Sequence, residues 1–326
     1  MDSLLRFRRS VLLALYATLF LVAVGSLVRA SGSGLGCPDW PHCFGSWIPP
    51  ISADQLPPEF DKSKFNVWQT WTEYINRLIG VVVGLLILWA AFRSASIRKT
   101  HTTGFIAAVA ALLLVAFQGW LGGVVVQTEL QPWLITAHML TALAIVMLLI
   151  YAWCATFPAE HWEELPKRDR RNLFNAGAAV FITLVTQIAI GTQVRERIDE
   201  ITNQTPDLPR TEWVERIHPI FAVHGAFAWA VVALSVILLY VAHRSEARGL
   251  ARRLALGCPL LLLLQMATGA GLSLLAIPPV LQILHLTVAA LAASGLFLLL
   301  LLTGARQEGS ARVPATGETE EACVRQ

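Results

Sequence analysis

Three histidines lie at comparable depths in strongly apolar segments of the chain. His138 and His285 each follow a proline that opens an apolar run, Pro132 or Pro279, by six residues, and His218 follows Trp213 by five. At 1.5 Å of rise per residue, six residues place a side chain about 9 Å along a helix. Ionisable groups are costly at that depth, and imidazoles from neighbouring helices are typical ligands of a haem iron. We therefore interpret these histidines as candidate haem ligands.

The elements that must position these histidines are apolar runs of bilayer length. Charged residues make up 14% of the 326 positions and apolar residues 55%, whereas soluble domains carry roughly 25% charged residues. The sequence therefore predicts an all-α integral membrane protein with eight transmembrane helices. The expected spans are 11–30, 73–93, 103–127, 132–157, 172–194, 215–243, 251–276 and 280–303. The net charge is only +3 and the basic residues sit in short clusters between apolar runs, so we expect no nucleic-acid partner.

Basic residues cluster in every other connection between these spans, beginning with Arg6, Arg8 and Arg9 ahead of the first span. The positive-inside rule then predicts that both termini are cytoplasmic. The connections 31–72 and 195–214 are expected to be loops on the outer side. Residues 304–326 are polar and predict a disordered cytoplasmic tail.

An internal repeat indicates that the spans form two tandem four-helix bundles. The intervals Gln118 to His138 and Gln265 to His285 are both twenty residues, at an offset of 147. The segment 71–76 matches 213–218 at an offset of 142, and 23–29 matches 189–195 at an offset of 166. We expect an N-terminal half (1–157), a cytoplasmic linker (158–171) and a C-terminal half (172–303), both halves crossing the membrane in the same direction.

The sixth span offers two candidates for the partner of His285. The repeat favours His218, whereas Pro219 disfavours helical geometry at the residue before it and so argues for His224, six residues deeper. The same repeat aligns Asn76 with His218, so the first half lacks one histidine.

Two further groups stand near the outer ends of the first spans. Glu73 and Arg77 lie four residues apart, on one face of a helix, where they could form a simple ion pair or take part in chemistry. Cys37 and Cys43 are separated by six positions in the long outer loop, and in an oxidising compartment this spacing favours a disulfide. A redox-active pair or a transient metal site stays open as the alternative.

Several of these segments together resemble the haem A synthases of bacteria and mitochondria. The outer-loop segment 32–43, GSGLGCPDWPHC, is the most specific part, and the segment 73–80, EYINRLIG, is the next. A further matching segment is 212–214, which contains Trp213 and leads to His218. His138 and His285, on their repeated helices, complete the match. The resemblance covers all eight spans.

The resemblance implies an enzyme that oxidises the C8 methyl group of haem O to a formyl group by successive hydroxylations, for maturation of cytochrome oxidase. It implies haem b between His218 and His285 in the C-terminal half, with His138 as an iron ligand of the substrate haem in the N-terminal half. It also implies a catalytic role for Glu73. A membrane b-type cytochrome that only relays electrons or delivers haem is the alternative.

The resemblance also bears on surroundings and partners. It implies a multi-pass protein of the bacterial cytoplasmic membrane, in contact with the lipid bilayer, with haem O synthase and cytochrome oxidase assembly factors as partners. An electron donor is required but is not identified by the sequence, and homo-oligomerisation stays open. One departure stands out: Asn76 occupies the position of a histidine in the family and is a poor ligand for iron.

Overall fold

The computed structural model describes residues 2–157, 165–205 and 207–304, and this part of the chain is helical without a β-strand. Eight of its helices are long and apolar enough to cross a membrane, which confirms the predicted fold class. They are α1 (Asp2–Ala30), α2 (Val67–Ser94), α3 (Thr102–Gln127), α4 (Pro132–Cys154), α5 (Lys167–Gln204), α7 (His218–Arg244), α8 (Gly249–Leu274) and α9 (Pro279–Gly304). The short α6 (Arg210–Arg216) precedes α7, and three single-turn 3₁₀ helices, η1 (Ala53–Gln55), η2 (Lys62–Lys64) and η3 (Ala95–Ile97), complete the set.

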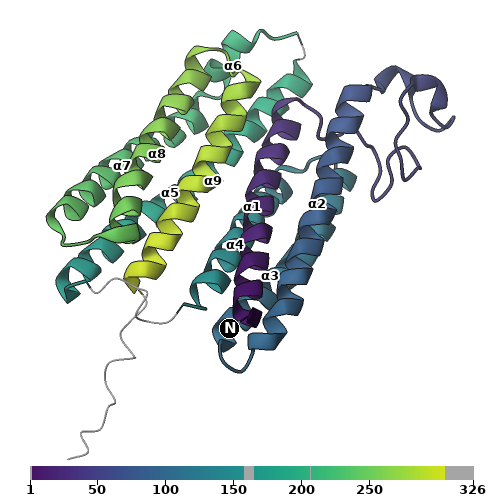
Figure 1. Ribbon diagram of the computed structural model, residues 1–326. Coiled ribbons are helices and arrows are strands. Elements are labelled where there is room, and N and C mark those ends of the chain that lie inside the picture. The colour runs from purple at the N-terminus through teal and green to yellow at the C-terminus, as the bar shows by residue number, and fades with distance from the viewer. Residues whose placement is uncertain (1, 158–164, 206, 305–326) are drawn as a thin grey trace, which may run out of the picture.

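The helices form two large apolar cores, which a smaller cluster of α4 and α9 side chains joins. Phe7, Ile87 and Leu149 belong to a core shared by α1 to α4, and Leu184 and Leu296 belong to one shared by α5, α7, α8 and α9. Figure 1 shows these two groups side by side, with α1 and α9 next to each other between them. The domain boundaries stay a prediction, because most of the linker and nearly all of the tail, at 158–164 and 305–326, lie outside the described residues.

The expected outer loop 195–214 is wrong, because α5 continues through it to Gln204. The apolar run ends near Val194, but the helix goes on as an amphipathic segment with Ile198 buried. Ion pairs at helical spacing, Arg195 with Asp199 and Arg197 with Glu200, support this extension. Hydropathy alone reports the end of the apolar run and not the end of the helix.

The helix that carries the two rival histidines begins later than expected. Ile217 has φ −97° and ψ 10°, outside helical geometry, so α6 ends before it and α7 starts at His218 with Pro219 in its first turn. Proline suits that position because its missing N–H would have no partner there. The expectation that His218 lies at the depth of His138 and His285 is therefore wrong. His224 instead is the seventh residue of its helix, as His138 is in α4 and His285 in α9.

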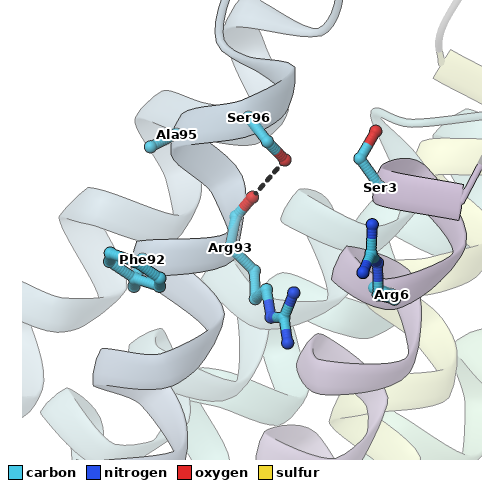
Figure 2. Close-up of a pocket in the computed structure, with 6 residues that line it drawn as sticks. All are labelled: Ser3, Arg6, Phe92, Arg93, Ala95 and Ser96. Atoms are coloured by element: carbon cyan, nitrogen blue, oxygen red, sulfur yellow. Dashed lines mark hydrogen bonds between the residues drawn. The ribbon is translucent and has the colours of Figure 1, made fainter.

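The end of the bundle opposite α6 carries basic side chains. Arg6 of α1 and Arg93 of α2 line a shallow pocket there with Ser3, Phe92, Ala95 and Ser96, as Figure 2 shows. The Arg93 guanidinium also lies over the Trp89 ring, 4.4 Å from its centroid. This pocket lies near the last turn of α2, whereas His138 and His285 lie near the first turns of α4 and α9. It therefore takes no part in the histidine site.

Candidate haem-binding site

His224 of α7 and His285 of α9 face each other across the C-terminal half. Their ring centroids are 6.5 Å apart, with an angle of 60° between the ring planes. Metal–imidazole bonds are about 2 Å long, so two imidazoles on opposite sides of one iron have ring centres roughly 6 Å apart. The observed separation suits a single iron between the two rings. His218, by contrast, is exposed at the first residue of α7.

Polar side chains on the neighbouring helices hold this pair in place. Thr268 Oγ1 lies 3.0 Å from His285 Nδ1. Gln187 donates from Nε2 to the His224 carbonyl at 2.8 Å, and the same nitrogen lies 3.3 Å from His224 Nε2. Hydrogen bonds of this kind orient imidazole ligands and set which ring nitrogen is free for the metal.

Glycines face the candidate ligands in a pattern that recurs four times. A Cβ on Gly191, Gly269 or Gly122 would lie 3.0, 3.1 or 3.3 Å from Cε1 of His224, His285 or His138, respectively. Such distances are tighter than ordinary contact, so a side chain there would push the imidazole. The fourth glycine, Gly25, faces Asn76, with Oδ1 at 3.9 Å from its notional Cβ.

This pattern corrects the alignment of the two halves around Asn76. Its counterpart in the C-terminal half is His224, which faces Gly191 as Asn76 faces Gly25. The offset of 142 had paired Asn76 with His218 instead. The signal that sequence reasoning missed is the spacing Gln187 to Gly191, which repeats Gln118 to Gly122 and Gln265 to Gly269.

Buried polar atoms without hydrogen-bond partners lie on or next to the residues that these glycines face, and we call this set of residues the histidine layer. Asn76 Oδ1, His138 Nδ1 and His224 Nδ1 have no hydrogen-bond partner, and neither do the Oε1 atoms of Gln118, Gln187 and Gln265. Buried polar groups in native proteins are almost always satisfied. Glycine-lined space, facing imidazoles and unsatisfied polar atoms together fit a bound haem. The described residues hold no group of three or more His, Cys, Asp or Glu that could bind a metal ion alone, and a porphyrin supplies the remaining ligands itself.

In the N-terminal half the layer contains a single histidine. His138 is half-buried on α4, and Gln118 donates from Nε2 to its carbonyl at 2.9 Å, as Gln187 does for His224. His42, in the long loop, packs edge-on against Trp47 with 4.5 Å between ring centroids.

Glu73 is the centre of a clamp that fastens the long loop to α2. Its side chain is buried, at 4% exposure. Oε2 accepts a hydrogen bond from the Cys37 amide at 2.9 Å, and Oε1 accepts from Arg77 Nη2 at 2.5 Å. Arg77 in turn donates to the carbonyls of Asp39 and His42, both at 2.8 Å. Both carboxylate oxygens are thus engaged in holding the loop.

The clamped segment is closed on itself and packed on two helices. Cys37 and Cys43 form a disulfide. Gly36 approaches α2 so closely that a Cβ would lie 2.3 Å from the Gln69 carbonyl oxygen, so only glycine fits. Trp40 covers Gly123 of α3, where a Cβ would lie 2.8 Å from the indole. Gly123 follows Gly122, which faces His138, so the loop reaches the histidine layer of the first half.

A family model described as cytochrome oxidase assembly protein matches residues 8–299. The chain belongs to this family. Its relatives include the haem A synthase of Shewanella oneidensis, 26% identical over 247 residues (71% of this chain, 72% of the relative). The haem A synthase of Geobacillus kaustophilus is 26% identical over 272 residues (78% of each), and that of a Methylobacterium strain is 26% identical over 317 residues (83% and 84%).

Membership of this family, with eight apolar helices, makes the chain a multi-pass protein of the bacterial inner membrane. Of the predicted residues, the structure brings His285 to His224 and Glu73 to Arg77 and Cys37. It does not bring His218 into the layer.

Proposed function

We propose that the chain is a haem A synthase that oxidises the C8 methyl group of haem O to a formyl group, for use in cytochrome oxidase. Membership of the cytochrome oxidase assembly family and relatives named haem A synthase support the activity. The observation that carries the proposal is the repeated layer in which glycines face His138, His224, His285 and Asn76.

We assign haem b to the C-terminal half, with His224 and His285 as its axial ligands. Their separation of 6.5 Å supports this choice over His218, which is exposed. We assign the substrate, haem O, to the N-terminal half, where His138 is the single imidazole ligand and Asn76 stands on the opposite helix. In this assignment the C-terminal half supplies electrons and the N-terminal half carries out the oxidation.

The bound haem iron supplies the oxidising chemistry, with oxygen and electrons from outside the chain. Gln187 and Thr268 orient the imidazoles of His224 and His285, and Gln118 binds the main-chain carbonyl of His138. The glycine faces stay open for the macrocycle. The long loop, with Trp40 over Gly123, excludes water from the substrate side. Glu73 binds the loop directly at the Cys37 amide and indirectly through Arg77, so it acts here as a positioning residue for that cover.

Production of haem A in a host that lacks it tests this proposal. The chain is co-expressed with haem O synthase, and extracted haems are separated by chromatography. We expect haem A with the native chain, little or none with Glu73→Ala, and normal amounts with Glu215→Ala, an exposed glutamate at the same end of the C-terminal half. Bound haem without any haem A from the native chain would favour the electron-relaying cytochrome.

Amide exchange of the loop in Glu73→Ala separates the two possible roles of Glu73. A positioning residue for the loop should leave the His224–His285 haem spectrum unchanged while the amides of residues 36–43 exchange faster with deuterium. A loop that stays protected while haem A formation stops would assign Glu73 to the chemistry itself.

A further inference from the structure

Two arginines occupy equivalent positions in the two halves, one turn from the histidine layer. Arg29 of α1 follows Gly25 by four residues, and Arg195 of α5 follows Gly191 by four. Residues four apart share a helix face, and four residues correspond to about 6 Å along the axis. Each arginine therefore lies on the face that meets Asn76 or His224, displaced toward the α6 end of the bundle.

Arg195 lies at the edge of the His224–His285 pair. Its Nη1 donates to Gln282 Oε1 at 2.5 Å, and Gln282 precedes His285 by three residues, on the same face of α9. The Nε atom of Arg195 is buried and has no hydrogen-bond partner. A guanidinium with an unused buried donor is thus held beside the candidate haem site.

The two arginines share one carboxylate as their ion-pair partner. Arg29 and Arg195 both form ion pairs with one carboxylate, that of Asp199. The neighbouring acid, Glu196, is buried and accepts a hydrogen bond from Thr136 at 3.1 Å. In the described part of the chain it forms no ion pair within 4 Å with either arginine. Two guanidinium groups therefore share a single ionic partner.

The ligand that this arrangement suits is a flat apolar ring with carboxylates on one edge. A porphyrin held between His224 and His285 must direct its propionates out of the apolar layer, toward the end of the bundle where Arg195 and Gln282 lie. Guanidinium groups bind carboxylates through paired, charge-assisted hydrogen bonds.

We propose that Arg195, positioned by Gln282, binds a propionate of the haem in the C-terminal half. Arg29 does the same in the N-terminal half, and Asp199 joins the two arginines across the contact between the halves. This inference rests on the proposed function, because it takes the histidine layer to hold haem.

Binding of two porphyrins that differ only in their carboxylates tests the inference. The purified full chain, depleted of haem, is titrated with haem b and with its dimethyl ester, and the dissociation constant of the low-spin species is measured for each. We expect the native chain to prefer haem b. In Arg195→Gln that preference should fall by roughly ten- to a hundredfold, through weaker haem b binding and unchanged ester binding.

Arg197→Gln is the matched control, because Arg197 is an exposed arginine on the same helix, paired with Glu200. It should bind both porphyrins as the native chain does. Arg195→Lys retains the charge and should recover part of the preference. Arg29→Gln should leave the low-spin species unchanged. It should weaken only the binding of a second equivalent of haem b, which does not form that species.

Each negative result of this binding experiment leads to a different conclusion. Equal weakening of both porphyrins by Arg195→Gln, or no change in either, would overturn the inference and leave Arg195 with a structural role. A native chain that binds both porphyrins equally, with a low-spin spectrum, would also overturn it while leaving the proposed function intact. A native chain that binds neither would overturn the proposed function.

Discussion

The N-terminal and C-terminal halves share one scaffold but differ at the position opposite the repeated histidine. In both, an odd-numbered span presents glycine to a polar side chain on the next span, and that side chain is His224 in one half and Asn76 in the other. An iron with two imidazole ligands is suited to electron transfer, whereas one with a free position can bind oxygen. Under the proposed function, this one side chain is what distinguishes the roles of the two halves.

The two halves also differ in the connecting segment between their first and second spans. The N-terminal half has its loop of residues 31–66 fastened to α2 by Glu73 and Arg77. The corresponding connection in the C-terminal half is helical, through the end of α5 and α6. Under the proposed function, the loop covers the half that exchanges its haem, and the mostly helical connection belongs to the half that keeps its haem.

The largest expected effect comes from removing the facing histidines. His224→Ala or His285→Ala should abolish the low-spin haem spectrum, because one axial ligand of the C-terminal iron is lost. His218→Ala is the control, six residues away on the same helix and exposed, and should keep the spectrum. Loss of the spectrum in His218→Ala with retention in His224→Ala would reverse the assignment. Optical and electron paramagnetic resonance spectra of the purified variants give the answer.

Restoring the missing imidazole should make the two halves alike. In Asn76→His we expect a second low-spin haem in each chain, because both axial positions of the substrate iron are then filled. Asn76→Gln, which keeps an amide, should not add low-spin haem. Quantitative electron paramagnetic resonance against total haem measures the ratio. An unchanged ratio in Asn76→His would mean that Asn76 does not face the iron.

The glycine contacts allow each half to be perturbed separately. Gly269→Ala should lower haem b content several-fold, because its Cβ would lie 3.1 Å from the His285 ring and overpacking costs about 1–3 kcal/mol. Gly257→Ala, in the same helix with open space around it, is the control. Gly122→Ala should instead impair the N-terminal site, with Gly119→Ala as its control. Haem per chain is measured by pyridine haemochrome. An equal loss of haem in the variants and in their controls would contradict this prediction.

The smallest expected effect concerns the loop alone. Thr70 donates to the Gly36 carbonyl at 2.8 Å, and a hydrogen bond of this kind contributes about 1 kcal/mol. Thr70→Val should therefore speed amide exchange in residues 36–43 by several-fold and leave the C-terminal haem spectrum unchanged. Thr72→Val serves as a control on the same helix. A change in the low-spin spectrum of Thr70→Val would show that the cover is not specific to the N-terminal half.

Features that depend on local sequence could be predicted without the structure. The eight spans follow from the length of each apolar run, since crossing a bilayer is a requirement on composition and length. The depths of His138 and His285 follow from Pro132 and Pro279, which begin their helices. The pairing of Glu73 with Arg77 follows from their spacing of four residues on one helix.

Only the tertiary structure decided which histidine meets His285 and what Glu73 holds. The choice of His224 depends on a helix break at Ile217, which leaves no trace in hydropathy, and on Gly191 of another helix. The contacts of Glu73 with Cys37 join residues 36 positions apart through the path of a loop. Helix periodicity determines which face a side chain occupies, whereas the partner opposite that face depends on packing between helices distant in the sequence.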